Sequence, residues 1–214
     1  MKIFAIAITA LSFMWSGALQ AEEFAFEEGT HYVALEVPIK LRDESKIQVA
    51  EYFSYGCPHC YLFEPLIGAW KEQLGDDVTF VRTPAVWNRD YQVYAQTYVT
   101  LEAMDMLDKA HIGIFNAIHD QRRRLNSPQL MAEFLVGFGI PAEDFARTYN
   151  SFGVRAALQQ ADSAGRAYRS TGVPALVING RYRIEGGMAG SNANMLRVAD
   201  FLIAKERQRL AAAD

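Results

Sequence analysis

The pattern of apolar and polar positions predicts alternating strands and helices in the first part of the chain. Residues 47–55 are mostly β-branched, aromatic or apolar, which is typical of a buried strand. Apolar residues then recur at helical spacing as far as residue 74, so a helix is predicted directly after this strand. A second short strand is predicted for residues 78–82. This order predicts a parallel strand pair joined by a right-handed crossover.

The pattern changes over residues 88–161, where long amphipathic segments follow one another with almost no strand signal. A third strand is predicted for residues 175–179, and Asn179-Gly180 is a hairpin turn signal before a returning strand over 182–185. A final helix is predicted for residues 192–210. Strands on both sides of a helical stretch indicate one α/β domain with a helical insertion rather than two domains in tandem.

Residues 1–21 have the order of a secretory signal peptide. Lys2 precedes an apolar run, and small residues stand at Ala18 and Ala21. A membrane-spanning helix needs about 20 apolar residues, and this run is shorter. We therefore expect export with cleavage after Ala21, or after Ala18 because Leu19 is not the small residue preferred before the cut. An uncleaved anchor and a buried core helix are the weaker alternatives.

The charge balance disfavours some classes of partner. The chain has 21 Lys and Arg against 25 Asp and Glu, and removal of residues 1–21 takes away only Lys2, which leaves 20 against 25, a net charge of −5. Such a mildly acidic surface argues against nucleic acid or an anionic membrane as the main partner. The densest basic run, Arg122–Arg124, is interpreted as a solvated helix end.

Cys57 and Cys60 are the two cysteines of the chain. A disulfide between them would stabilise the fold little, because the entropic gain grows with the length of the closed loop. A zinc site would need further ligands, and His31, His111 and His119 do not stand at ligand spacing. We therefore predict no metal, treat these three histidines as ordinary core or surface residues, and interpret the cysteine pair as redox-active.

The position of the cysteines at a strand-to-helix turn favours a thiolate at the first of them. Pro58 at the first helical position places Cys57 at the helix N-cap, where it faces free backbone N–H groups and the positive end of the helix dipole. His59 can add a positive charge or a donor and lower the pKa of Cys57 further. Cys60 lies on the same side of the helix and is expected to be the buried partner. Since a stable thiolate stabilises the reduced form, we expect the protein to give its disulfide away.

Val173-Pro174 stands directly before the third predicted strand. One interpretation is a simple turn. The other is a cis peptide bond that lies against the cysteine pair, where the exposed backbone of Val173 would pair with an extended substrate. The residues alone leave both interpretations open.

Glu51 is an acidic residue in an otherwise apolar strand. By alternation it would point inward, where a carboxylate needs a partner, and Arg82 at the end of the neighbouring strand is a plausible one. A buried Glu51 could accept or relay a proton when Cys60 ionises. The alternative places Glu51 at a solvated edge of the sheet.

Taken together, these segments resemble one known family. Residues 51–61, read EYFSYGCPHCY, with Phe63-Glu64, Tyr149–Phe152 and Thr171–Pro174, are similar to the DsbA family of bacterial periplasmic thiol oxidases, and the similarity runs through essentially the whole mature chain. The resemblance implies an α/β thioredoxin fold with an inserted all-helical domain. The discontinuous thioredoxin domain would comprise residues 22–84 and 162–214, and the helical domain residues 85–161.

The resemblance also implies a periplasmic thiol:disulfide oxidoreductase whose Cys57–Cys60 disulfide is its redox group, without a further cofactor. Cys57 would be the nucleophile and the Val173–Pro174 bond would be cis. The implied partners are unfolded exported proteins with reduced cysteines and a membrane quinone reductase of the DsbB type, and a monomer is expected. Better-known members carry lysine where Arg82 falls, and arginine cannot give up its proton, so a lysine-type role in proton transfer is in doubt here.

Two alternatives stay open. One is a disulfide isomerase or reductase of the same fold, which is disfavoured because periplasmic isomerases of this kind resemble dimers with a separate N-terminal domain, whereas residues 22–46 leave little room for one. The other is a non-catalytic peptide-binding chaperone in which the cysteine pair is merely structural. Such a chaperone would keep its activity in a Cys57→Ser variant.

Overall fold

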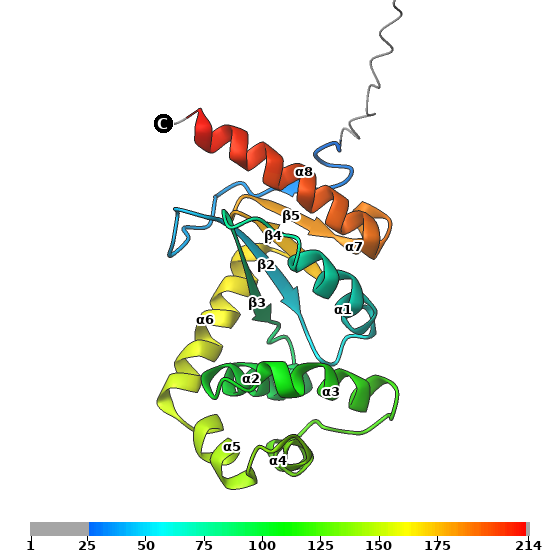
Figure 1. Ribbon diagram of the computed structural model, residues 1–214, viewed down its shortest axis with the longest axis vertical. Coiled ribbons are helices and arrows are strands. Elements are labelled where there is room, and N and C mark those ends of the chain that lie inside the picture. Colours follow the sequence, from blue (N-terminus) through cyan, green and yellow to red (C-terminus); the bar gives the residue numbers. More distant parts are fainter. Residues whose placement is uncertain (1–25, 213–214) are drawn as a thin grey trace, which may run out of the picture.

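The computed structural model describes residues 26–212 (Figure 1). The expected signal peptide, residues 1–21, and its two candidate cleavage points lie outside the described residues. Among the helices that are described, none combines the length and apolar character needed to cross a membrane.

The described chain folds into one five-stranded sheet with helices around it. The strands are β1 (Val33–Ala34), β2 (Ile47–Phe53), β3 (Val78–Pro84), β4 (Ala175–Ile178) and β5 (Tyr182–Glu185). The α-helices are α1 (Pro58–Lys71), α2 (Arg89–Ala103), α3 (Leu107–His119), α4 (Pro128–Leu135), α5 (Ala142–Tyr149), α6 (Phe152–Tyr168), α7 (Gly186–Ala189) and α8 (Asn192–Ala211), and a 3₁₀ turn (Val136–Phe138) follows α4.

The sheet has the strand order β1-β5-β4-β2-β3. β2 and β3 are parallel, as predicted, whereas β4 pairs antiparallel with both β2 and β5. The predicted hairpin turn is also confirmed, because Asn179 and Gly180 both have positive φ, at 49° and 61°. Gly180 is required there for a second reason, since an added Cβ would lie 2.5 Å from the carbonyl oxygen of Ile39.

Helices cover both faces of the sheet (Figure 1). On one face, apolar residues of α1 and α8 pack against β2, β4 and β5 around Phe63, Ile178 and Leu202. On the other face, Tyr168 at the end of α6 packs against Tyr52 and its neighbours in the sheet. The alternating side chains of β2 therefore divide between two apolar layers, which is why this strand is buried almost throughout.

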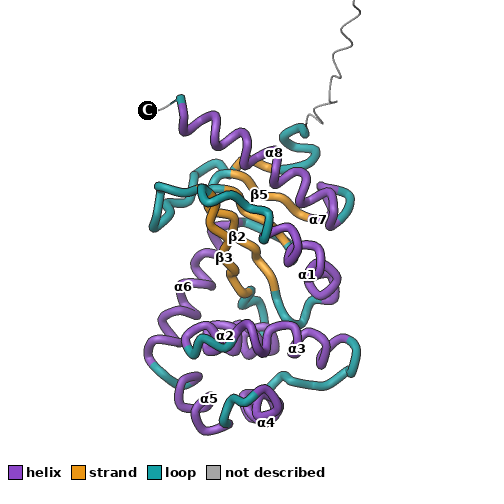
Figure 2. Tube along the Cα trace, viewed as in Figure 1, coloured by secondary structure: helices purple, strands orange, loops and turns teal. Residues whose placement is uncertain are grey.

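Helices α2 to α5 gather beyond the end of the sheet where β2 leads towards α1 (Figure 2). Their core includes Phe115 and Phe145 and continues through Phe53 to Cys57 and Cys60. The cysteine pair therefore lies where the sheet and the helical part of the molecule meet.

The fold class is confirmed as a mixed α/β sheet with an inserted helical stretch, and several bounds are corrected. The first predicted strand ends at Phe53 rather than at residue 55, and β3 continues to Pro84. The two-residue strand β1 and the four-residue helix α7 were not predicted, because elements so short show no periodicity. The predicted domain boundary between residues 161 and 162 falls inside the continuous helix α6, and the division at 84/85 and 161/162 stays a prediction.

Candidate active site

Cys57 is the N-cap residue of α1, with φ −95° and ψ 117°, and Pro58 occupies the first turn of the helix. Gly56 lets the ring of Tyr94 lie close to the chain here, since a Cβ on it would lie 2.8 Å from that ring. Both sulfurs are free thiols and both residues are buried, with Cys57 5% and Cys60 0% exposed. The first cysteine thus sits at the helix start, as the sequence predicts, and the second lies beneath it.

The two thiols differ strongly in acidity. Hydrogen bonding from the Cys60 thiol is the largest cause that lowers the pKa of Cys57, which falls to about 6 from its ordinary value of 9.0. Burial opposes this fall, whereas the backbone N–H groups of Cys60 and His59 and the charge of His59 add to it. Burial raises the pKa of Cys60 well above its ordinary value. Cys57 is therefore the thiolate of the pair, and its partner thiol contributes more to this than the sequence suggested.

The Val173–Pro174 peptide bond is cis, as the second interpretation expected. The sulfur of Cys57 donates a hydrogen bond to the carbonyl oxygen of Val173 at 3.2 Å. Val173 and Pro174 line a hollow of about 440 Å³. The exposed side chain of His59 lines it too, together with Glu185 and Asn192. Val173 therefore both contacts the sulfur of Cys57 and borders this hollow.

Glu51 points into the protein and is 0% exposed, so the solvated-edge alternative is wrong. It lies directly opposite Arg82 in the parallel β2–β3 pair, and Arg82 Nε donates to Glu51 Oε2 at 2.7 Å. Burial raises the pKa of Glu51 to about 7 against the opposing charge of Arg82. Within residues 26–212 its Oε1 atom has no hydrogen-bond partner, which adds to the cost of keeping the group charged. After burial and the neighbouring Cys57, the negative charge of Glu51 also contributes to the raised pKa of Cys60.

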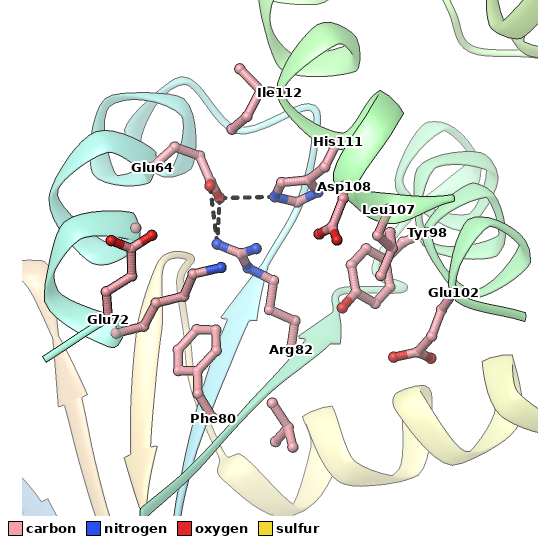
Figure 3. A pocket seen from close by; sticks show the side chains of 13 residues that line it. Glu64, Glu72, Phe80, Arg82, Tyr98, Glu102, Leu107, Asp108, His111 and Ile112 are labelled. Atoms are coloured by element: carbon pink, nitrogen blue, oxygen red, sulfur yellow. Dashed lines mark hydrogen bonds and ion pairs between the residues drawn. The ribbon is translucent and has the colours of Figure 1, made fainter. Parts of the chain in front are cut away.

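Two residues that the sequence reasoning missed complete this cluster (Figure 3). Arg82 Nη2 donates to both carboxylate oxygens of Glu64, at 3.1 and 3.0 Å, and His111 Nε2 lies 3.2 Å from Glu64 Oε1. Glu64 could have been recognised, because it stands four residues after Cys60 on the buried face of α1. His111 could not, because its approach depends on how α3 packs against α1.

The neighbours of the His111 ring fix where its proton lies. Burial lowers the pKa of His111 and raises the pKa of Tyr55, so near neutral pH the imidazole is neutral and the phenol is protonated. Although burial opposes it, the contacts with His111 and Arg82 lower the pKa of Glu64, so Glu64 is a carboxylate that can only accept hydrogen bonds. His111 Nε2 lies 3.2 Å from Glu64 Oε1 and therefore carries the proton of the ring. Nδ1 then accepts from Tyr55 Oη, 2.8 Å away.

A cavity of about 450 Å³ connects this cluster with the space between α1, α2 and α3 (Figure 3). Arg82, Glu64 and His111 point into it, and charged residues such as Lys71 and Asp108 lie around it. The buried Arg82–Glu64 pair therefore borders a cavity that is lined by further charged side chains. No group of three His, Cys, Asp or Glu side chains that could hold a metal ion occurs among the described residues.

The comparisons with known proteins agree on one family. Residues 67–200 match the family model described as a DSBA-like thioredoxin domain. The chain is 42% identical over 201 residues to the thiol:disulfide interchange protein DsbA of Pseudomonas aeruginosa, with 94% of each chain covered. It is also 42% identical over 209 residues to the protein of that name from Azotobacter vinelandii, with 96% of this chain and 98% of that one covered.

Solved structures give the same result. The crystal structure of Pseudomonas aeruginosa DsbA matches with a TM-score of 0.83 at 43% sequence identity, over 88% of this chain and 97% of that one. The oxidoreductase DsbA from Xylella fastidiosa matches with a TM-score of 0.78 at 30% identity, over 83% of this chain and 96% of that one.

Proposed function

The chain belongs to the DsbA family and is a protein disulfide oxidoreductase, and from this premise we propose that it is a periplasmic oxidase that donates its Cys57–Cys60 disulfide to newly exported proteins. The observation that carries the proposal is the difference between the two thiols. A Cys57 pKa of about 6 makes its thiolate a good leaving group and stabilises the reduced protein, whereas the buried Cys60 stays protonated.

The proposed reaction is a thiol–disulfide exchange in two steps. A substrate thiolate attacks Sγ of Cys57 in the oxidised protein, so that a substrate–Cys57 disulfide forms and the Cys57–Cys60 bond breaks. Cys60 leaves with the electron pair and takes up a proton. A second substrate thiolate then attacks the substrate sulfur of the mixed disulfide and releases the Cys57 thiolate. The substrate loses two electrons, and the cysteine pair of the protein gains them.

The proton for Cys60 is proposed to come from Glu51. Glu51 is buried, its charge contributes to the raised pKa of Cys60, and its own pKa is about 7, so at neutral pH it is protonated in a large fraction of molecules. Arg82 is fixed between Glu51 and Glu64 and cannot itself deprotonate, so its role is to hold the two carboxyl groups. Glu64 and His111 line the polar cavity through which Glu51 would regain its proton.

Substrates are proposed to bind in extended form beside Cys57. The carbonyl oxygen of Val173 faces the sulfur, and an extended chain that pairs with this backbone would bring its own cysteine to Cys57. Pro174 contributes no N–H to this surface, and His59 borders it from the start of α1.

The proposed site of action is the periplasm, which rests on the signal-like residues 1–21 and on the family. The substrates are unfolded exported proteins with reduced cysteines. The reduced cysteine pair would pass the two electrons from the substrate on to a membrane quinone reductase of the DsbB type. Together these steps make the protein a carrier that cycles between its disulfide and dithiol forms.

The test is oxidative refolding of a reduced, unfolded protein by the oxidised form of this chain. We expect rapid formation of substrate disulfides with one equivalent of reduced Cys57–Cys60 pair produced for each, and no reaction with the Cys57→Ser variant. Full activity of the Cys57→Ser variant would show a chaperone instead. Faster rearrangement of wrong disulfides than formation of new ones would show an isomerase.

A further inference from the structure

Two charged side chains on β5 lie beside the segment that carries Val173. Arg183 and Glu185 are two residues apart on this strand, so they lie on the same face of the sheet. Arg183 Nε is 3.3 Å from Glu185 Oε1, and the side chains are only 14% and 17% exposed. Glu185 stands opposite Ala175, the first residue of β4. This register places its carboxylate next to the connection that leads into β4.

Arg183 binds the start of that connection. Its Nη1 atom donates to the carbonyl oxygen of Tyr168 at 3.2 Å and also to that of Arg169. Tyr168 is the last residue of α6 and Arg169 is its left-handed C-cap, so these carbonyl groups lack partners within the helix. A cation at this end also interacts favourably with the helix dipole. The connection to β4 therefore begins from a fixed point.

Glu185 binds the next two residues of the connection. Its Oε1 atom accepts a hydrogen bond from the backbone N–H of Thr171 at 3.0 Å and lies 2.6 Å from Ser170 Oγ. Ser170 Oγ is also 2.7 Å from the carbonyl oxygen of Gly172, so its single proton is donated to one acceptor at a time. One carboxylate thus holds the two residues that precede Gly172 and Val173.

The segment held in this way is the one that faces the reactive sulfur. Val173 accepts the hydrogen bond from Cys57 two residues after Thr171, and Glu185 itself lines the hollow beside His59. We propose that Glu185, oriented by Arg183, is a positioning residue that fixes the backbone of residues 170–173 for binding of extended peptide substrates. This inference rests on the proposed function, because it concerns the substrate of the same site.

A positioning role predicts a difference between two kinds of substrate. An extended peptide must pair with the backbone of Val173, and hydrogen bonds weaken steeply when donor and acceptor are misaligned. A small dithiol can reach the sulfur of Cys57 without that pairing. Loss of Glu185 therefore weakens the reaction with peptides and leaves the reaction with a small dithiol unchanged.

The experiment measures oxidation of a reduced cysteine-containing peptide and of dithiothreitol by the oxidised protein, with wild type, Glu185→Ala and Glu185→Gln compared. In the alanine variant we expect the second-order rate constant for the peptide to fall about tenfold, as for loss of one hydrogen bond to a charged group. The fall should come from a higher half-saturating peptide concentration, with an unchanged maximal rate. Glutamine keeps an acceptor for the Thr171 N–H, so Glu185→Gln should recover part of the loss.

Glu206→Gln is the matched control. Glu206 is another buried acid, bound to Asn179 and Arg209 at the opposite end of the β4–β5 hairpin, so its loss should lower stability without changing the ratio of peptide to dithiothreitol rates. A wild-type ratio in the Glu185 variants, or equal loss of both rates, would overturn the positioning role. If Glu185→Ala does not fold, the ratio of the peptide to the dithiothreitol rate constant in Glu185→Gln alone tests the positioning role. If the wild-type protein itself fails to oxidise the peptide, that result contradicts the proposed function and also the inference that rests on it.

Discussion

The sulfur of Cys57 lies 3.2 Å from the carbonyl oxygen of Val173, although the two residues are 116 positions apart in the chain. The contact joins the start of α1 to the entrance of β4 across the β2–β4 pair. A hydrogen bond from the thiol to this carbonyl is available only while Cys57 is protonated. The backbone segment that is proposed to bind substrate therefore also contacts the sulfur of Cys57 while it is protonated.

The first prediction concerns which neighbours acidify Cys57. Cys60→Ala should raise the pKa of Cys57 more than His59→Ser, because the Cys60 thiol is the largest cause of the low value and the charge of His59 is a lesser one. Ultraviolet absorbance of the thiolate against pH measures both variants. An equal or larger rise in His59→Ser would show that the histidine charge dominates.

The second prediction concerns the stability of the reduced protein. The pKa of Cys57 is lowered from 9.0 to about 6, so the stabilisation it gives is fully present above pH 9.0 and is lost as the pH falls through about 6. The oxidised protein has no thiolate and lacks this dependence. Between about pH 5 and about pH 8, the melting temperature of the reduced form should therefore rise relative to that of the oxidised form. A constant difference would contradict the low pKa.

The third prediction concerns Glu51. Because it is proposed to donate a proton to the leaving Cys60, disulfide opening by a fixed concentration of substrate thiolate should slow as the pH rises through about 7. Glu51→Gln should be slower below this pH and should lose the inflection. Stopped-flow fluorescence measures the rates. An inflection that persists in Glu51→Gln would assign the proton to another group.

The fourth prediction concerns Arg82. Arg82→Met leaves the buried Glu51 and Glu64 without their cation, and breaking a buried pair in this way costs about 3–5 kcal/mol. Arg82→Lys keeps the positive charge but loses the planar guanidinium group that contacts both carboxylates. The free energy of unfolding should therefore fall less in Arg82→Lys than in Arg82→Met. Urea unfolding of the reduced proteins gives the free energies. Equal stability of wild type and Arg82→Met would show that Arg82 does not stabilise a charged Glu64.

The parts of the site that follow from local chemistry could be predicted from the sequence. Pro58 after Cys57 predicted the N-cap, the apolar run around Glu51 favoured an inward carboxyl over a solvated edge, and Asn179-Gly180 predicted the hairpin. Each depends on residues close together in the chain.

The parts that depend on distant packing could not be predicted. His111 reaches Glu64 only because α3 packs against α1, and no spacing in the sequence relates these two residues. The same holds for Glu185, whose carboxylate meets Thr171 through the β4–β5 register. The Val173–Pro174 bond stayed ambiguous because a proline before a strand fits a turn equally well.

The central claim, that this protein is an oxidant through Cys57 and Cys60, is tested most directly by its reduction potential. The protein is equilibrated with mixtures of reduced and oxidised glutathione, and the fraction of free thiols is measured by alkylation and mass spectrometry. The low pKa of Cys57 predicts a potential above that of thioredoxin, which is about −270 mV. A potential at or below that of thioredoxin would mean that the protein reduces disulfides rather than donates them.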